Sequence, residues 1–249
     1  MYTTKWCIGF AMVCSVVSAH AGTIAYDGFD YAPGSLSGDN GGTGFLTPWT
    51  GNPNVVVQKP GLSHPFGQPS SGLDIGGGFV VSRGLIGSLA QSEYWASFEI
   101  NSNPGNDQVW LGLDTVPTNV PGIAFGRRLD KFFLEVGPTT VAAGGVPSGT
   151  GITDLLVARF TQVGPLTKVD VWANTNDFTL PPLLSTSVPT VAYTWVNVEV
   201  QPGLFADEIR LGTSAAFVAS SVPEPQTQAL FGVGLVAAGF AFNRRQRRH

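Results

Sequence analysis

The chain has 249 residues, a formal net charge of −4 and a pI near 5.3, and only 12% of its residues are charged. Its 32 glycines and 18 prolines suit short strands joined by turns better than long helices. This composition excludes coiled coils, helical repeats and polytopic membrane proteins, and the acidic balance argues against a nucleic-acid partner.

The first 21 residues are typical of a secretory signal peptide. Lys5 supplies a positive start, an apolar run covers Trp6–Val17, and Ala19-His20-Ala21 is a small–x–small cleavage pattern. We expect this signal helix to be cleaved by signal peptidase after Ala21, which leaves Gly22 as the mature N-terminus. A buried N-terminal helix or strand is the alternative.

Removal of the signal segment also removes both cysteines, Cys7 and Cys14. The mature chain then has no thiol for a disulfide, a nucleophile or a metal site. Between the signal segment and the C-terminal tail only one histidine is left, His64, and a Ser-His-Asp triad would have to use it. Its proline- and glycine-rich surroundings predict an exposed loop.

Residues 22–222, between the signal peptide and the C-terminal tail, form the body of the chain. Motifs at both ends of this body identify a candidate fold. The body opens with Tyr26-Asp27-Gly28-Phe29-Asp30-Tyr31 and Gly34-Ser35-Leu36, continues with Gly41-Gly42-Thr43-Gly44 and Trp49, and closes with Ala206-Asp207-Glu208-Ile209-Arg210-Leu211-Gly212. These segments resemble the first and last strands of concanavalin A-like, laminin-G-like modules. The resemblance implies an all-β, antiparallel jelly-roll β-sandwich over residues 22–213, in which the first and last strands pair.

The residues between these motifs follow a strand-and-turn pattern. Short runs rich in β-branched and aromatic residues alternate with clusters of Gly, Pro, Asn and Asp, and no useful window has helical periodicity. The predicted strands are Tyr94–Ile100, Gln108–Leu113, Lys131–Val136, Leu155–Gln162, Lys168–Ala173, Trp195–Val200 and Glu208–Leu211. Antiparallel strands at this spacing favour two packed sheets over a parallel α/β sheet.

Four tryptophans fall on the more polar face of their predicted strands. Successive side chains of a strand alternate between faces, and this alternation places the indoles opposite the apolar residues. The four are Trp95, Trp110, Trp172 and Trp195. One hypothesis is an aromatic platform on one sheet that stacks against sugar rings or another apolar partner. The alternative is that covering loops, or membership of different sheets, make these indoles satellite core.

Three carboxylates at the two ends of the body are candidate calcium ligands. Asp27 and Asp30 lie in the opening segment and Asp207 in the closing one, so they would approach one another if the first and last strands are neighbours. Backbone carbonyls would complete a structural Ca²⁺ site. The alternative is that these residues are solvated turn residues, and no other cofactor is expected.

Enzymatic candidates are few. Residues 22–222 contain eight basic and 16 acidic residues, a net charge of −8, which favours neutral sugars or Ca²⁺ over polyanions as ligands. Glycosidases need two carboxylates that face the sugar. No two of the five glutamates in this region are two or four residues apart, so a catalytic pair would have to be assembled from different strands.

The C-terminal 28 residues have three parts in a fixed order. Val222-Pro223-Glu224-Pro225 is a stiff break, because each proline restricts its own residue and the preceding one. An uncharged run follows over Ala229–Phe242, and a basic cluster then holds Arg244, Arg245, Arg247 and Arg248. We expect one transmembrane helix with the arginines in the cytoplasm and the body outside.

This tail resembles the PEP-CTERM sorting signal of exopolysaccharide-producing Gram-negative bacteria. The resemblance implies an exosortase, a membrane protease that cleaves near Pro223-Glu224-Pro225, as a partner during export. A plain C-terminal anchor or a basic amphipathic tail is the alternative, with the same orientation. The implied organisation is a signal peptide (1–21), a β-sandwich (22–213), a linker (214–222) and a sorting segment (223–249).

Together these patterns predict an exported, non-enzymatic protein of the cell envelope, outer surface or extracellular matrix. Its role would be structural or adhesive, with polysaccharide as a candidate partner and the inner membrane holding the C-terminal helix before processing. One alternative is a secreted carbohydrate-active enzyme, a glycosidase or lyase, on the same fold. Another is a matrix protein that has no small ligand.

Overall fold

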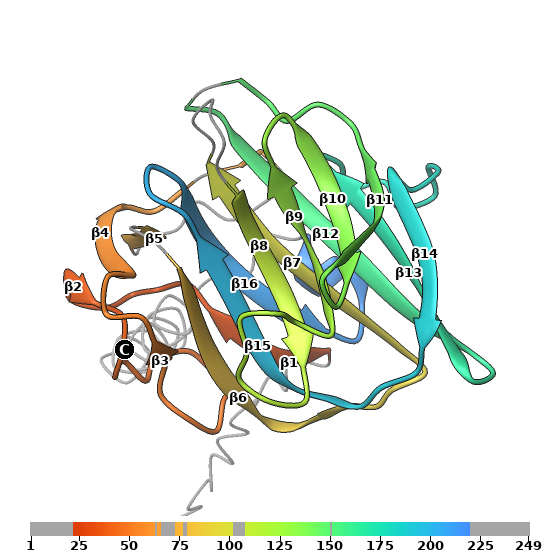
Figure 1. Cartoon of the computed structure of the whole chain (residues 1–249), viewed down its shortest axis with the longest axis horizontal. Coiled ribbons are helices and arrows are strands. Elements are labelled where there is room, and N and C mark those ends of the chain that lie inside the picture. The colour runs from red at the N-terminus through yellow and green to blue at the C-terminus, as the bar shows by residue number, and fades with distance from the viewer. Residues whose placement is uncertain are drawn as a thin grey trace, which may run out of the picture.

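The computed structural model describes residues 22–62, 64–65, 73–76, 79–101, 108–149 and 151–219, which form two stacked antiparallel sheets (Figure 1). The nine-stranded sheet runs in the order β14 (Leu184–Pro189), β13 (Leu166–Ala173), β12 (Thr153–Val163), β7 (Glu93–Asn101), β16 (Phe205–Gly212), β5 (Leu73–Gly76), β4 (Val56–Pro60) and β2 (Gly34–Ser35), with β1 (Thr23–Asp27) also paired to β16. The seven-stranded sheet runs in the order β11 (Thr139–Gly144), β10 (Lys131–Val136), β9 (Ile123–Arg128), β8 (Gln108–Asp114), β15 (Tyr193–Val200), β6 (Val80–Leu89) and β3 (Thr50–Gly51).

The predicted all-β sandwich is confirmed. All seven strands expected from the sequence are present, with ends that agree within three residues, and β10 has the predicted bounds. The first and last strands pair as expected, with Thr23 opposite Gly212 and Asp27 opposite Ile209. Strand alternation and turn residues were sufficient for these assignments because both are local properties of the chain.

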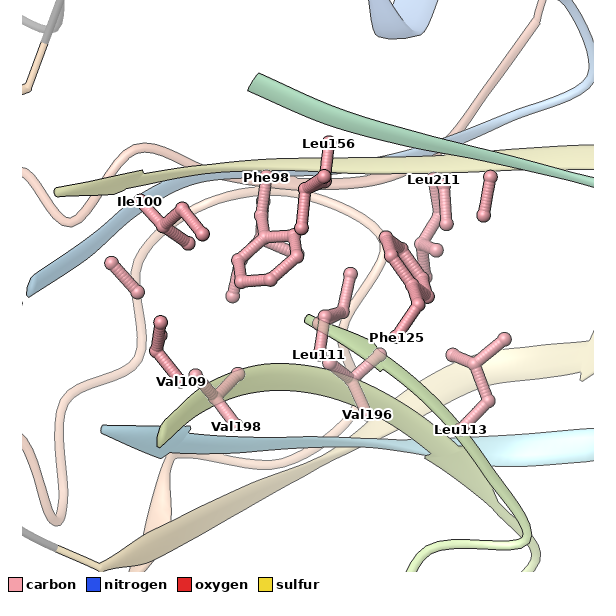
Figure 2. Packing of buried hydrophobic residues seen from close by; sticks show 14 of the residues in the cluster. Phe98, Ile100, Val109, Leu111, Leu113, Phe125, Leu156, Val196, Val198 and Leu211 are labelled. Atoms are coloured by element: carbon pink, nitrogen blue, oxygen red, sulfur yellow. The ribbon is translucent and has the colours of Figure 1, made fainter. Parts of the chain in front are cut away.

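The core lies between the two sheets and is made by alternate residues of each strand. Figure 2 shows Phe98 and Ile100 from β7 and Leu156 from β12 facing Leu111 from β8 and Val198 from β15. All of these side chains are buried in one continuous apolar cluster. Their burial is the main source of stability for the sandwich, at about 25 cal/mol for each Å² of apolar surface removed from water.

One glycine is required where the N-terminal segment crosses β1. Gly44 has a φ of +80°, and a Cβ atom there would lie 1.9 Å from the carbonyl oxygen of Ile24. Backbone hydrogen bonds between Tyr26 and Thr43 hold the two segments together. Only a residue without a side chain permits this approach.

The last strand contains a bulge that changes which side chains face outward. Its register with β7 shifts between Asp207 and Arg210, and Glu208 has a φ of +53°. A bulge places extra residues opposite one partner residue and re-aims their side chains. Ile209 and Leu211 remain in the core, whereas Asp207 and Arg210 pair with residues on the outer face of β7.

The sandwich extends beyond its predicted C-terminal boundary. Residues expected to form a linker include a short helix, α1 (Ala215–Val218), in which Val218 is buried. The Ser97 hydroxyl donates to the carbonyl oxygen of Val218 at 2.7 Å and attaches this helix to β7. Within the described ranges no helix has the length and apolar character needed to cross a membrane. The expected signal helix and transmembrane helix lie outside the described residues.

Candidate functional site

The outer face of the seven-stranded sheet carries a pocket of about 450 Å³. Its lining includes Gly51, Asn52, Phe79, Val80, Asn119 and Glu199. The pairing of β15 with its two neighbours places Glu199 opposite Val80 of β6 on one side and Trp110 of β8 on the other. Three segments that are distant in sequence therefore meet at this site. Its volume is in the range of about 300–1,000 Å³ that is usual for small-ligand sites.

Glu199 is held rigidly by three uncharged donors. Its Oε1 accepts hydrogen bonds from Gln108 Nε2 at 2.7 Å and Gln201 Nε2 at 3.0 Å, and its Oε2 accepts one from Trp110 Nε1 at 2.7 Å. The side chain is 9% exposed. This arrangement fixes the orientation of the carboxylate at the pocket wall.

Phe79 exposes an aromatic ring beside this carboxylate. The residue has a φ of +80°, a region that bulky side chains rarely adopt, and its side chain is 61% exposed. Such strained conformations cost about 1–3 kcal/mol and cluster at functional sites. Because the exposed ring lines the pocket, it provides a flat apolar surface for a ligand.

Asn119 reaches the pocket from the loop between β8 and β9, which is fastened to the sheet. Thr118 N donates to Asn197 Oδ1 at 3.4 Å, and Pro121 covers Gly112 so closely that a Cβ there would lie 2.6 Å from Pro121 Cβ. Within the described part of the chain, Asn197 Nδ2 is buried without a hydrogen-bond partner. Asn119 itself is exposed.

Beside the pocket, the outer face of the seven-stranded sheet carries an apolar cluster and, next to it, an ion pair. Val80, Trp110, Ala124 and Phe133 form a small buried cluster across neighbouring strands. Arg128 lies over the Phe133 ring, 4.8 Å from its centroid, and pairs with Glu135 at 2.5 Å. Arg128 Nε also donates to Gln108 Oε1 at 2.7 Å, so one network of hydrogen bonds links this ion pair to Glu199.

The four candidate carbohydrate-binding tryptophans do not form a single platform. Trp95 and Trp172 lie in the nine-stranded sheet and Trp110 and Trp195 in the seven-stranded one, and all except the half-buried Trp195 are buried. Their predicted positions outside the main core are correct for Trp95, Trp110 and Trp172, since these indoles belong to separate clusters. The platform hypothesis is wrong because covering segments and the division between sheets keep the four apart.

Trp95 and Trp172 illustrate how the outer face of the nine-stranded sheet is covered. Their rings stack with centroids 5.9 Å apart, and Phe178 packs on both. Val218 of α1 completes this cluster. Indole nitrogens are satisfied within the protein, with Trp172 Nε1 donating to the Leu180 carbonyl oxygen at 2.9 Å. These two indoles therefore belong to a small buried cluster separate from the main core.

The predicted calcium ligands are separated by their own partners. Asp27 is buried and pairs with Arg83 at 2.5 Å, and it also accepts hydrogen bonds from Tyr31 Oη at 2.6 Å and Trp49 Nε1 at 2.9 Å. Asp30 is exposed. Within the described ranges no group of three or more His, Cys, Asp or Glu side chains could hold a metal ion. The prediction that Asp27, Asp30 and Asp207 share a cation is wrong, because Arg83 already supplies the positive charge beside Asp27.

Asp207 instead joins a buried acidic group on the outer face of the nine-stranded sheet. It lies opposite Glu99 of β7, and neither side chain is exposed. The pKa of Glu99 is raised to about 8, chiefly by burial and in addition by the nearby Glu208, while Arg210 acts in the opposite direction. Burial also raises the pKa of Asp207 well above its usual range. Leu62 N donates to Asp207 Oδ2 at 2.8 Å, so the segment at residue 62 covers this group.

His64 differs from its prediction. It was expected in an exposed loop, but its side chain is only 7% exposed. Burial lowers its pKa, while Asp154 and a hydrogen bond with Asn174 act in the opposite direction. The Asp154 carboxylate accepts hydrogen bonds from Asn174 Nδ2 at 2.6 Å and from Ser148 N, so it joins the residues before β12 to those after β13.

The remaining predicted sites lie outside the described residues. They are the signal cleavage residues Ala19 and Ala21 and the sorting residues Pro223, Glu224, Pro225, Arg244, Arg245, Arg247 and Arg248. The sequence did not identify the pocket, since Phe79, Asn119 and Glu199 are far apart along the chain. The polar position of Glu199 within an alternating strand was the only local signal.

Comparison with known proteins identifies the C-terminal tail. Residues 221–248 match the PEP-CTERM protein-sorting motif, so the chain carries the signal of an exported, exosortase-sorted protein. No curated protein matches the chain in sequence. Solved structures that resemble the chain were also found, with sequence identities of 8–13% and TM-scores of 0.40–0.46.

Three of these neighbours indicate the level of similarity. A Trypanosoma rangeli sialidase has 9% identity and a TM-score of 0.46 over 80% of this chain and 32% of its own. Botulinum neurotoxin type C has 13% identity and a TM-score of 0.45 over 86% and 51%. The carbohydrate-binding module CBM66 from Bacillus subtilis has 9% identity and a TM-score of 0.40 over 60% and 92%. The chain spans about a third of the sialidase, and at this similarity the matches indicate nothing about what the chain binds.

Proposed function

We propose that this PEP-CTERM protein is exported to the cell envelope, outer surface or extracellular matrix, where its β-sandwich binds polysaccharide without catalysing a reaction. The motif at residues 221–248 supports export and exosortase processing. Its partners during export would be signal peptidase, exosortase and the inner membrane. No cofactor is required by this proposal.

The observation that carries the proposal is the composition of the pocket on the seven-stranded sheet. An exposed aromatic ring, two amide side chains and a fixed carboxylate converge there: Phe79, Asn52, Asn119 and Glu199. Sugars present hydroxyl groups to planar hydrogen-bonding side chains and C–H faces to aromatic rings. The same combination suits polysaccharide better than it suits an apolar ligand or a polyanion.

Binding of the full-length chain in detergent to a glycan array tests the proposal. We expect binding of at least one polysaccharide class, and a loss of about tenfold or more in the Phe79→Ala variant, because the stacking ring is removed. Leu46→Ala is the matched control, since Leu46 is also an exposed apolar side chain, 69% accessible, that is not among the pocket residues. Absence of glycan binding by the unmodified chain would overturn the proposal and favour a matrix protein without a small ligand.

A carbohydrate-active enzyme is the second candidate, because Glu99 and Asp207 are two carboxylates on neighbouring strands. Both side chains are fully buried, and Leu62 N occupies Asp207 Oδ2. This burial supports a non-catalytic role for the pair. Release of reducing sugar from a bound polysaccharide, abolished by Glu99→Gln, would instead establish the enzyme.

A further inference from the structure

The pocket on the seven-stranded sheet has an unbalanced charge. Glu199 is the only charged residue among the described residues that line it. The three groups that hydrogen-bond its carboxylate are two amides and an indole, all of them uncharged. Within the described part of the chain, no Lys, Arg or His lies within ion-pair distance of this carboxylate.

In the described part of the chain, ion pairs compensate some of the other buried carboxylates of the sandwich, although not Glu99 or Asp207. Four of them pair directly with a cation: Asp27 with Arg83, Glu135 with Arg128, Asp170 with Arg159 and Lys168, and Glu208 with Arg210. Arg128 is linked to Glu199 through Gln108, to which it donates a hydrogen bond, but its ion pair is with Glu135. Glu199 therefore presents a negative charge that the neighbouring side chains leave uncompensated.

The carboxylate also keeps capacity for a ligand. An ionised carboxylate has about four acceptor positions. Two of the three hydrogen bonds to Glu199 go to Oε1 and one goes to Oε2. One acceptor position on Oε2 is then left for a donor in the pocket, and a positively charged donor would make the stronger, charge-assisted bond.

We infer that the pocket selects amino-sugar units that carry an ammonium group and rejects uronic acids. This inference rests on the proposed polysaccharide binding and specifies its ligand. An ammonium group would satisfy the open acceptor and neutralise the charge of Glu199. A uronate carboxylate at the same place would meet a like charge that no described lining residue offsets.

Titration with three oligosaccharides of equal length tests the inference on the full-length chain. The probes are oligomers of glucosamine, N-acetylglucosamine and galacturonate, used at one salt concentration and at mildly acidic pH, where the amine is protonated. We expect the glucosamine oligomer to bind about tenfold tighter than the N-acetylated one. Galacturonate should bind at least about tenfold weaker than the N-acetylated oligomer.

The Glu199→Gln variant should reduce the preference for glucosamine over N-acetylglucosamine to within about twofold. Glu93→Gln removes the same charge at an exposed position that is not among the pocket residues, and it should leave the preference unchanged. An equal loss of preference in both variants would show that the overall acidity of the protein, rather than Glu199, attracts the amine, and would overturn the inference.

A second variant avoids the buried hydrogen bonds of Glu199. Asn119 is exposed in the pocket loop, so Asn119→Lys should fold normally. We expect it to weaken glucosamine binding and strengthen galacturonate binding by about tenfold each. Tight binding of N-acetylglucosamine by the unmodified chain, with no preference for glucosamine and no discrimination against galacturonate, overturns this inference and leaves the proposed function intact. Failure of all three oligomers to bind the unmodified chain overturns this inference, and only the absence of any binding on the glycan array overturns the proposed function as well.

Discussion

Glu99 on β7 lies directly opposite Asp207 on β16, and neither side chain is exposed to solvent. Both Glu99 carboxylate oxygens are buried without a hydrogen-bond partner in the described part of the chain. Opposite residues of an antiparallel pair have Cβ atoms only about 4.5–5.5 Å apart. Two ionised carboxylates at this separation would repel each other, and burial raises both pKa values.

Stability should therefore fall as the pH rises from about 4.5 to about 8. Folding raises the pKa of Glu99 from 4.5 to about 8, so over this window the folded state binds a proton that the unfolded state releases. The contribution of Glu99 to the free energy of unfolding is complete below pH 4.5. It decreases by up to about 1.4 kcal/mol for each pH unit between pH 4.5 and about 8. Urea unfolding of the full-length chain at several pH values measures this slope.

Glu99→Gln should flatten this dependence and make the variant more stable than the unmodified chain at pH 8, because the amide resembles the protonated acid. Glu93→Gln, on the exposed start of the same strand, is the control and should retain the slope. A slope that persists unchanged in Glu99→Gln would assign the pH dependence to other groups, such as Asp207.

Removal of the Arg83 side chain should strongly lower the free energy of unfolding, because this buried residue of β6 holds several neighbouring segments. Its guanidinium pairs with Asp27, donates to the Thr47 carbonyl oxygen at 2.7 Å and to Asn40 Oδ1 at 2.7 Å, and lies 4.3 Å from the Phe45 ring centroid. Arg83→Met leaves a buried carboxylate unpaired, so we expect a loss of about 3–5 kcal/mol in the free energy of unfolding.

Arg128→Met is the matched control, because the Arg128 side chain is 39% exposed and its ion pair with Glu135 should contribute about 1 kcal/mol or less. The measurement is chemical denaturation followed by tryptophan fluorescence. Equal losses in the two variants would contradict a special role for the Asp27–Arg83 pair.

Val218 should belong energetically to the sandwich and not to a linker. It is 1% exposed and packs in the cluster of Trp95 and Trp172. Val218→Asp places a carboxylate in that cluster, and we expect a loss of about 3 kcal/mol or more. Val163→Asp at a 61% exposed position should change stability by less than about 0.5 kcal/mol. If Val218→Asp left both the free energy of unfolding and the tryptophan emission unchanged, residues 215–218 would belong to the linker and not to the sandwich.

Phe79 should show a conflict between stability and binding. At its φ of +80° a glycine is less strained than any residue with a Cβ atom, so Phe79→Gly should be about 1 kcal/mol more stable than Phe79→Ala. At Leu46, which is not among the residues with positive φ, the Gly variant should be the less stable of the two. Thermal unfolding of the four variants measures the stability difference between Gly and Ala at each position. Both Phe79 variants should lose glycan binding.

Much of the fold was predictable because strand signals are local. Alternation in Lys131–Val136 was enough to predict β10, and the same alternation placed Trp95 and Trp172 outside the main core. It could not show that Phe178 and Val218 cover these indoles, because both come from segments with no periodic pattern. Burial of an outward-facing side chain depends on what crosses over it.

The candidate site was less predictable for the same reason. Asp27 was predicted to be a calcium ligand, but its actual partner is Arg83, which is 56 residues away and carries no local signal of that role. Glu199 could be read only as a polar residue on an outer face until Phe79 and Asn119 were placed beside it. Pairing partners and covering loops are long-range facts that the strand pattern does not contain.

By itself the sequence determined that the protein carries an export and sorting motif and that its body is made of antiparallel strands, because sorting motifs and side-chain alternation are properties of short segments. Only the tertiary structure decided which outward-facing side chains stay accessible. The order of strands, the bulge at Glu208 and the loop that carries Asn119 bury the carboxylates of one sheet and open a pocket on the other. A polar side chain becomes a ligand site only where neighbouring segments leave it reachable, and that depends on contacts between residues distant in the chain.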